Sequence, residues 1–345
     1  MKKAKHIARV HPSAGIPGGE VAIEFTQPIT KEAKPPEIWL GEHRAHLVAA
    51  NARRLLALIP NVSGGGEIEV SINYAGETKC LGTAGTFVTA SKLAGGLHPV
   101  ANPAFDPADD SLFVTRSGSR GEHVPTSMFR IARDGTVAEF SGDITNPTAI
   151  AFDKKGQMFV TSRFDGCVYR VTPVKEVIEF ATELGIATGL AFDRDGEMFV
   201  GDRSGTIFRV NEIGEAKPWA QLEPSVSAYH LAFGPDDDLY VSGPTVSSFD
   251  SITRFDQQGR PSVFYRGLGR PQGLAFDRDG NLYVAASLRG RRGIVRISSD
   301  GITAQLVVAG MNVIGLAFSS RGEMIVATNE SIYALPLGIH GTLLE

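Results

Sequence analysis

Few residues of this 345-residue chain have a type and spacing that would support catalysis. It contains no Gly-x-Ser-x-Gly elbow, no His-Glu-x-x-His pair, no Cys-x-x-Cys pair and no phosphate-binding glycine loop. Asp202 and His230 fall at the ends of predicted strands, and a carboxylate beside an imidazole can move protons. A hydrogen bond inside the fold explains this pair more simply, so we assign no catalytic residue.

Aspartate-rich turns are the second chemical feature. The segments 193–196 and 277–280 both read DRDG, and 234–238 reads GPDDD, a composition that could suggest calcium. They lack the spacing and the closing bidentate glutamate of a calcium loop. We interpret them as turns in which Asp binds its own backbone. Cys80 and Cys167 are the only cysteines, too few for a disulfide framework or a cysteine metal site. We therefore predict no metal and no cofactor.

Arginine is concentrated in predicted loops. The arginines in these loops are Arg116, Arg120, Arg163, Arg203, Arg289, Arg291 and Arg292. The same loops also contain the acidic residues Glu122, Asp165, Asp202 and Asp250. The guanidinium group suits recognition of carboxylate or phosphate and is frequent at interfaces. These arginines could equally be solvated surface charges. Because the turns at the other end of the repeats are rich in Asp, we also expect the opposite face to be acidic.

The elements that carry these residues repeat along the chain. The sequence GLAFDRDG occurs at Gly189–Gly196 and again at Gly273–Gly280, and weaker copies place a shared Phe at 105, 152, 192, 233, 276 and 318. Each copy reads as four short strands joined by polar turns, which is the unit of a β-propeller blade. We therefore predict a six-bladed β-propeller over residues 91–345.

Closure of the ring has two solutions. The C-terminal HGTLLE resembles RDGTVAEF at 133–140, the fourth strand of the first repeat, so we favour it as the outer strand of the last blade. In the alternative, the segment around Ser91–Ala94 closes the ring from the N-terminal side.

Residues 1–90 lack the repeat. Short alternating runs such as EVAIEF, HRAHLVAA and GEIEVSINY are separated by turn-rich segments, a pattern that favours a two-sheet antiparallel sandwich. In GEIEVSINY, the apolar Ile68, Val70 and Ile72 share one face of the predicted strand.

Both parts resemble known families. The resemblance of the first part is to the IPT/TIG family, which implies an Ig-like, non-catalytic module. It is carried by the run at 38–77 and by the opening residues Pro12, Ser13, Gly15, Gly18, Gly19, Val21 and Ile23. The recurring LAFDxDGxxYV resembles NHL repeats and the SMP-30/gluconolactonase group of six-bladed propellers. That resemblance indicates architecture more than activity.

Lactonases of that group hold a divalent metal with one Glu, two Asn and one Asp before the innermost strands. The corresponding positions here are Ala101, Thr188, Tyr229 and Gln272, and Thr148 and Ile314 stand in the two remaining repeats. None is a carboxylate, whereas hard divalent cations need several oxygen ligands, usually including charged ones. The resemblance therefore implies that the metal site, and the lactone hydrolysis it supports, are absent.

Composition limits the partners. The net charge of −4 gives no general attraction to nucleic acid, and no run of 18 apolar residues indicates a membrane span. No signal peptide is visible, so the expected compartment is the cytoplasm unless a leader was removed. Oligomeric state stays open.

The sequence thus favours a non-enzymatic binding or scaffold protein. Its partner would be a protein, or a small anionic or carbohydrate ligand, held by the arginine-bearing face. The predicted binding residues are Thr148, Thr188, Tyr229, Gln272, Arg116, Arg163, Arg203 and Arg289. One alternative is a lactonase-like hydrolase with an unrecognised site. A second is a structural subunit of a larger assembly.

Overall fold

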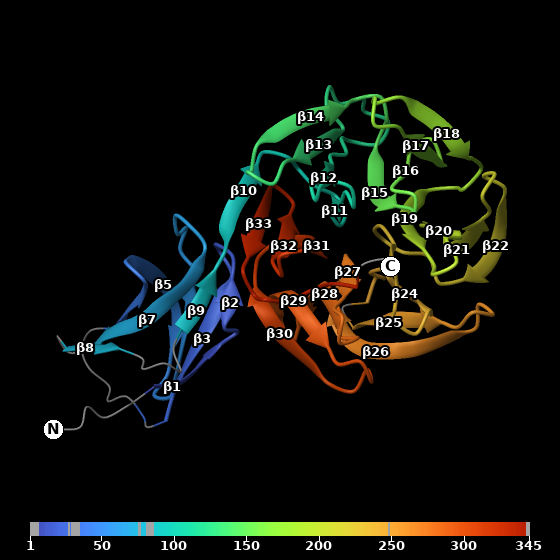
Figure 1. The fold of residues 1–345 in the computed structure, drawn as a ribbon. Helices are drawn as coiled ribbons and strands as arrows, with labels where there is room; N and C mark the ends of the chain where they lie inside the picture. Colours follow the sequence, from blue (N-terminus) through green and yellow to red (C-terminus); the bar gives the residue numbers. More distant parts are fainter. Residues whose placement is uncertain are drawn as a thin grey trace.

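The computed structural model describes residues 7–26, 28, 35–74, 77–80, 86–247 and 249–342. Every regular element in these ranges is a β-strand, and within them no helix is long and apolar enough to cross a membrane. Figure 1 shows a propeller-like ring of sheets with the N-terminal strands packed on one side of it.

Four sheets of the ring are separate, antiparallel and four-stranded. The first contains β11 (Ala104–Phe105), β12 (Leu112–Thr115), β13 (Met128–Ile131) and β14 (Val137–Ser141). The second contains β15 (Pro147–Phe152), β16 (Met158–Ser162), β17 (Cys167–Val171) and β18 (Val177–Ala181). The third contains β19 (Ala187–Phe192), β20 (Met198–Asp202), β21 (Thr206–Val210) and β22 (Ala216–Gln221). The fourth is formed by β31 (Val313–Phe318), β32 (Met324–Thr328), β33 (Ser331–Leu335) and β10 (Ser91–Gly95).

Two further sets of four strands complete the circuit but belong to a 17-stranded sheet that continues into the N-terminal part. One set is β23 (His230–Phe233), β24 (Leu239–Ser242), β25 (Asp250–Phe255) and β26 (Pro261–Gly269). The other is β27 (Leu274–Phe276), β28 (Leu282–Leu288), β29 (Arg291–Ile297) and β30 (Ala304–Ala309). The sets are joined because the end of β26 pairs with the end of β28.

The repeated Phe is explained by packing between neighbouring sheets. Phe192 of β19 packs against Phe159 of β16 in the preceding sheet, with ring centroids 5.4 Å apart in an edge-to-face geometry. The equivalent Phe233 packs in the same way on Phe199, at 5.1 Å. Such pairs contribute about 0.5–1.5 kcal/mol beyond the burial of their area. The repeated Phe at 152, 276 and 318 likewise contacts an aromatic ring of the preceding sheet or four-strand set, whereas Phe105 packs in a cluster that contains Ile325.

The prediction that the C-terminal HGTLLE forms the last outer strand is wrong. β10 pairs antiparallel with β33, so the chain arriving from the N-terminal part occupies that edge. Of the C-terminal segment, residues 340–342 lie against the start of the turn after β27, where Thr342 N donates to Phe276 O at 3.1 Å. Residues 343–345 lie outside the described residues. Similarity to 133–140 misled the prediction because the edge of β33 was already filled.

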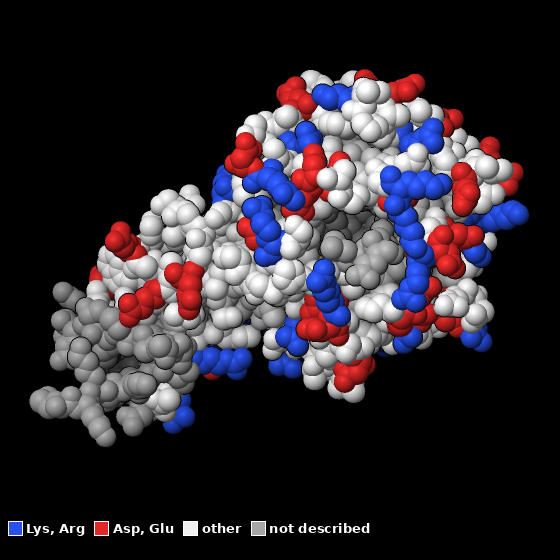
Figure 2. Space-filling view, viewed as in Figure 1, with Lys and Arg blue, Asp and Glu red and all other residues white. Residues whose placement is uncertain are grey.

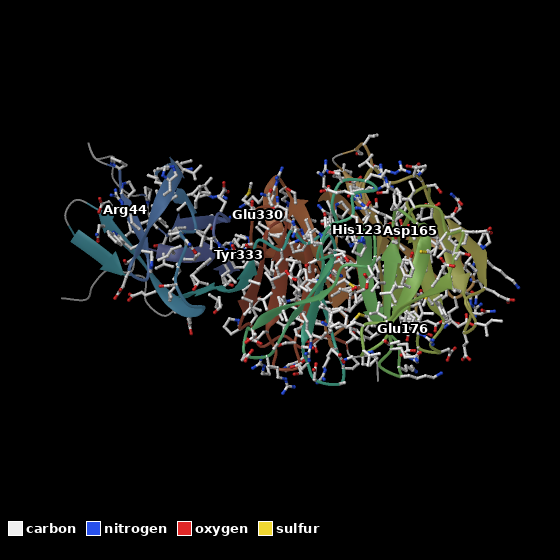
Figure 3. The ribbon with its side chains drawn as sticks, turned by 90° about the horizontal axis from the view of Figure 1, so that it is seen from above. Arg44, His123, Asp165, Glu176, Glu330 and Tyr333 are labelled. Carbon is white, nitrogen blue, oxygen red and sulfur yellow. The ribbon has the colours of Figure 1, made fainter. Side chains whose placement is uncertain are left out.

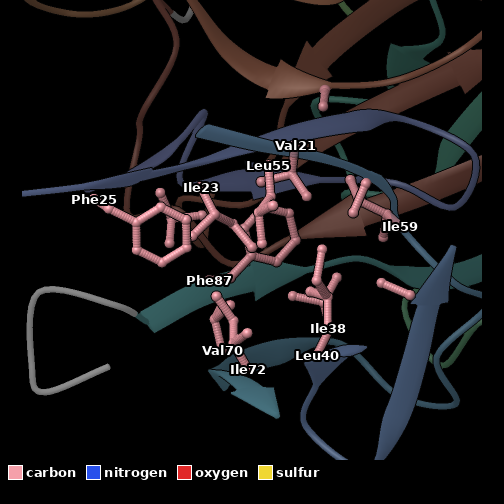
Figure 4. Close-up of a cluster of buried hydrophobic side chains, with 14 residues drawn as sticks. Val21, Ile23, Phe25, Ile38, Leu40, Leu55, Ile59, Val70, Ile72 and Phe87 are labelled. Carbon is pink, nitrogen blue, oxygen red and sulfur yellow. The ribbon is translucent and has the colours of Figure 1, made fainter. Parts of the chain in front are cut away.

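The N-terminal strands enclose a separate apolar core. They are β1 (Ile7–His11), β2 (Ala14–Gly15), β3 (Glu20–Phe25), β4 (Glu37–Leu40), β5 (His43–Ala50), β6 (Arg54–Leu58), β7 (Gly66–Tyr74), β8 (Glu77–Cys80) and β9 (Thr86–Thr89). Side chains of β3 and β6 meet those of β4 and β7, with Phe87 between them (Figure 4). Val70 and Ile72 are buried while Glu67 and Glu69 are exposed, which confirms the alternation predicted for β7.

The N-terminal part is joined to the ring through β2. This short strand pairs in parallel with β9 on one side and with β30 on the other. Gly19 allows the approach, because a Cβ there would stand 2.6 Å from the carbonyl carbon of Ala309. Arg291 adds hydrogen bonds from Nη2 to the carbonyl oxygens of Glu20 and His11, at 2.8 and 3.1 Å. Backbone pairing therefore continues across the joint.

Candidate functional site

The predicted arginines lie at one end of the ring, which we call the loop face. It is formed by the loops between the second and third strands of each set of four strands, at residues 116–127, 163–166, 203–205, 243–249, 289–290 and 329–330. The opposite end, the turn face, carries the turns between first and second strands. In Figure 3, His123 and Asp165 lie on the loop face, whereas Glu176 lies at the other end of the ring.

Asn146 connects two loops of the loop face. Its side chain is fully buried, and Nδ2 donates to the carbonyl oxygens of Gly118 and Ser119 at 3.2 and 2.9 Å. Its Oδ1 accepts a hydrogen bond from Gly121 N at 2.7 Å. Arg163 Nη2 donates to the same Gly118 oxygen at 2.8 Å. The loop that carries Arg120 is therefore fixed beside Arg163.

Arg203 joins this group from the next sheet. Its Nε donates to Ser225 O at 3.1 Å and its backbone N to Ile186 O at 3.1 Å. Leu184, two residues before Ile186, is bonded to Gly166 in the loop of Arg163. Burial, with Arg203 and Arg120 nearby, lowers the pKa of Arg163, whose Nε is buried without a hydrogen-bond partner. We call Arg120, Arg163 and Arg203 the arginine cluster.

Two carboxylates of the loop face, Asp202 and Asp250, accept hydrogen bonds from nearby loop residues. Asp202 is buried, and its Oδ1 accepts hydrogen bonds from Ile186 N at 2.8 Å and Ser204 N at 3.1 Å. Asp250 is also buried and accepts a hydrogen bond from Thr245 Oγ1 at 2.7 Å. These oxygens fix backbone turns, so they are poorly placed to serve as metal ligands or bases.

Arginines of the two faces differ in their partners. In the described part of the chain, Arg116, Arg120, Arg163, Arg203 and Arg289 form no ion pair. Toward the turn face, third-strand arginines pair with turn carboxylates: Arg130 with Asp109, Arg209 with Glu197, and Arg254 with Asp236 and Asp238. In the view of Figure 2, basic and acidic side chains are intermixed over the visible face.

The expectation of an acidic opposite face therefore needs correction. That expectation was based only on the aspartates in the turns between first and second strands. It omitted the arginines that the third strands direct toward those turns, such as Arg254, whose Nε lies 2.6 Å from Asp238 Oδ2.

Three of the residues predicted at the channel mouth are buried. Thr188 Oγ1 accepts a hydrogen bond from Tyr229 N at 3.0 Å and donates to Gly201 O at 3.2 Å. The Tyr229 hydroxyl donates to Glu223 O, and burial raises the pKa of Tyr229 to about 12. Thr148 is buried with its hydroxyl unpartnered. Of these side chains, Thr188 bonds the backbone of the next sheet at Tyr229. A role of the three residues in ligand binding remains a prediction.

Gln272 is half-buried, and its backbone N donates to Ala285 O at 2.9 Å. Near it the inner strands approach closely around Asn102, whose side chain bonds Leu274 O at 2.9 Å and Leu316 N at 3.0 Å. A Cβ on Gly273 would overlap Asn102 Oδ1 and stand 2.6 Å from Gly315 Cα. Asn102 thus brings the chain before β11 into close contact with β27 and β31.

Asp202 and His230 are not joined by a hydrogen bond in the described part of the chain. His230 is buried, and this lowers the pKa of its imidazole to about 4. It lines a cavity of about 580 Å³ between the innermost strands, together with Ala191, Phe233 and Phe276. Gly341 and Thr342 also line this cavity. Asp202 and His230 therefore do not form the proton-transfer pair that the sequence suggested.

Exposed apolar side chains on the loop face were missed by the sequence analysis. Val246 is 97% exposed and Phe249 64%, both in the loop 243–249, and Phe164 beside Arg163 is 51% exposed. No lysine occurs in the loops of this face. Interfaces are enriched in Arg and aromatic residues and depleted in Lys. Loop position alone could have suggested Phe164 and Phe249, because both stand between polar residues.

The described residues include no group of three or more His, Cys, Asp or Glu side chains that could hold a metal ion. The positions of Ala101, Thr188, Tyr229 and Gln272 therefore offer no set of charged oxygens. A free carboxylate cage, which a hard cation would need, is not formed by the part of the chain that the structure describes.

Comparison with known proteins identifies the fold. No model of a known protein family matches the chain, and no curated protein matches it. A putative gluconolactonase structure aligns with a TM-score of 0.61 and 17% identity, over 74% of this chain and 93% of that one. An auxiliary nutrient binding protein from Bacteroides thetaiotaomicron aligns with a TM-score of 0.57 and 14% identity, over 95% and 96%. Virginiamycin B lyase from Staphylococcus aureus gives 0.52 and 16%, over 80% and 93%.

At these identities the likeness shows an all-β propeller fold and nothing about activity. The names of the three similar structures indicate different functions, which agrees with the rule that one fold carries many sites.

Proposed function

We propose that this chain is a non-enzymatic binding or scaffold protein whose loop face holds a protein partner, or a small anionic or carbohydrate ligand. The observation that carries the proposal is the arginine cluster. Arg120, Arg163 and Arg203 converge from three loops, none has an ion-pair partner among the described residues, and Arg163 Nε is buried without a hydrogen bond. Like charges held together in this way favour an anion from outside.

Fold and composition support the same proposal. We infer that the four separate sheets and the two four-strand sets form six blades, and that residues 1–90 are an IPT/TIG-type, Ig-like module serving as a spacer or docking domain. The exposed Phe164, Val246 and Phe249 give the loop face the apolar contacts that a protein partner would bury. Arg116 and Arg289 extend the proposed surface around the ring.

Retention on a sulfopropyl matrix tests the cluster directly. The chain has a net charge of −4 at pH 7, so retention requires a local cationic surface. We expect the R163Q/R203Q variant to elute at a clearly lower salt concentration than the wild type. The R209Q/R254Q variant loses the same charge from arginines that are already paired with carboxylates. Equal shifts in the two variants would refute the special role of the loop face.

The alternative is a lactonase-like hydrolase, and it is favoured by the gluconolactonase-like structure among the similar folds. Thermal unfolding with calcium or zinc, combined with lactone turnover, separates the two functions. The proposal predicts neither a metal-dependent rise in Tm nor turnover. A second alternative, a structural subunit of a larger assembly, predicts a native mass well above that of one chain.

A further inference from the structure

A cleft between two neighbouring sheets is lined by Arg170, which forms no ion pair among the described residues. It lies between the sheet β11–β14 and the sheet β15–β18, which are adjacent in Figure 1, and has a volume of about 680 Å³. Arg170 lines it together with Lys155 and Lys175, and Phe113, Phe140 and Met158 supply apolar surface. The cleft is independent of the loop face.

Comparison of the repeats shows why Arg170 is unusual. In the third repeat, Arg209 stands opposite Phe199 and forms an ion pair with Glu197. In the second repeat, Arg170 stands opposite Phe159 in the same register, and the residue equivalent to Glu197 is Gln157. No ion pair or hydrogen bond of the Arg170 side chain is found among the described residues. The internal carboxylate has been replaced by a neutral amide.

The turns that carry the two residues are built alike. Glu197 N and Gln157 N each donate to Oδ1 of the Asp four residues earlier, both at 2.8 Å. Position 157 is therefore held like position 197, and only the charge of its side chain differs. Arg296 of the fifth repeat also faces an amide, Asn281, but it does not line this cleft. Two arginines line the cleft. Arg130 is paired with Asp109, whereas Arg170 has no carboxylate partner among the described residues.

The remaining charges of the cleft leave an excess of cations near Arg170. Asp109 is paired with Arg130, and Asp106 accepts a hydrogen bond from Ala108 N within its own turn at 2.8 Å. Glu139 is exposed at the rim. The ammonium group of Lys175 lies over the Phe140 ring, 5.4 Å from its centre, so a cation and an aromatic ring are in contact at the cleft.

We propose that this cleft binds a small carboxylate with an apolar or aromatic body, whose carboxylate gives Arg170 the negative charge that Glu197 gives Arg209 in the third repeat. The guanidinium of Arg170 would receive the carboxylate, with Lys155 and Lys175 nearby. The body of the ligand would rest against Phe140. A charge-assisted pair of this kind is the strong class of hydrogen bond, and it fixes orientation as well as affinity.

Binding of 3-phenylpropanoate, with 3-phenylpropanamide as its uncharged counterpart, tests the inference by calorimetry and NMR. We expect the acid to bind at least about tenfold more tightly than the amide, because one charge-assisted hydrogen bond is lost. The Q157E variant supplies an internal carboxylate and should weaken binding of the acid about tenfold, with an unchanged or higher Tm. The matched E197Q variant should bind the acid as the wild type does.

Equal binding of acid and amide would overturn the inference. So would undiminished binding by Q157E, or no detectable binding of the acid by the wild type. None of these outcomes affects the loop face, which the sulfopropyl experiment tests separately.

Discussion

The two faces of the ring use arginine in opposite ways. On the turn face, Arg209 and Arg254 extend from third strands to carboxylates in the turns and form ion pairs. On the loop face, Arg163 and Arg203 donate to backbone carbonyl oxygens, and the nearby Asp202 is occupied by backbone N–H groups. The same residue type is paired with carboxylates at one end of the ring and bonded to backbone carbonyl oxygens at the other.

The difference teaches that formal charge does not identify a binding face. Both faces contain acids and bases, and the net charge of the chain is only −4. What distinguishes the loop face is that Asp202 and Asp250 are bonded within their own loops, while Arg120, Arg163 and Arg203 form no ion pair among the described residues. A protein surface with that imbalance attracts anions even when the whole chain is weakly negative.

The largest expected effect concerns the contact of Gly273 with Asn102 and Gly315. The substitution Gly273→Ala places a methyl group against Asn102 Oδ1 and Gly315 Cα, and should destabilise the fold by about 3 kcal/mol. Gly201→Ala is the control, because its Cβ would meet only the flexible end of Leu231 at 3.0 Å and Tyr229 Cβ at 3.2 Å. Urea unfolding measures both. Equal, small effects would show that the inner strands can separate at this level.

The second prediction concerns pH. Burial lowers the pKa of His230 to about 4, whereas an unfolded His titrates near 6.5. Between these values the unfolded state binds more protons, so stability falls as the pH falls from 6.5 to 4. The full contribution is about 3 kcal/mol. Urea unfolding of wild type and His230→Leu across this range should show a shallower pH dependence in the variant. Parallel curves would mean that His230 is solvated.

The third prediction concerns the acids of the loop face. Asp202→Ala leaves Ile186 N and Ser204 N without their acceptor and should lower the free energy of unfolding by about 2 kcal/mol. Asp195→Ala, in an exposed turn, should cost less than about 0.5 kcal/mol. If Asp202→Ala were neutral in chemical unfolding, its carboxylate would be available for other chemistry.

The smallest effects compare single arginines of the two faces. Arg254→Gln removes an arginine paired with Asp236 and Asp238, and should destabilise the fold by about 0.5–1 kcal/mol, since the group is partly exposed. Arg203→Gln breaks no ion pair and should stay within about 0.5 kcal/mol of the wild type. Thermal unfolding of the two variants in parallel distinguishes them. A larger loss for Arg203→Gln would make it a structural residue.

Much of the fold could be predicted from sequence because one packing unit recurs. The Phe at 192 and 233 repeats because each must meet an aromatic ring of the preceding sheet, and the strands of the N-terminal part follow from simple alternation. Closure of the ring could not be predicted this way. It depends on which of two distant segments pairs with β33, and the repeat carries no information on that choice.

The candidate site was only partly predictable. Loop position was enough to place Arg163 and Arg203 on one face. It could not show that Asn146 fixes the loop of Arg120 beside Arg163, since that contact depends on a side chain buried between two loops. It also could not show that Thr188 and Tyr229 are buried in contact with each other, because residues before an inner strand can point into the channel or between sheets.

Affinity capture with three forms of the chain tests the role of the loop face most directly. Wild type, R163Q/R203Q and R209Q/R254Q would be tagged, expressed in the source cells and cross-linked before quantitative mass spectrometry. The account predicts a partner recovered by the wild type and by R209Q/R254Q, cross-linked to loop-face residues, and reduced by about tenfold or more with R163Q/R203Q. Equal recovery by all three forms, or cross-links confined to the turn face, would contradict it.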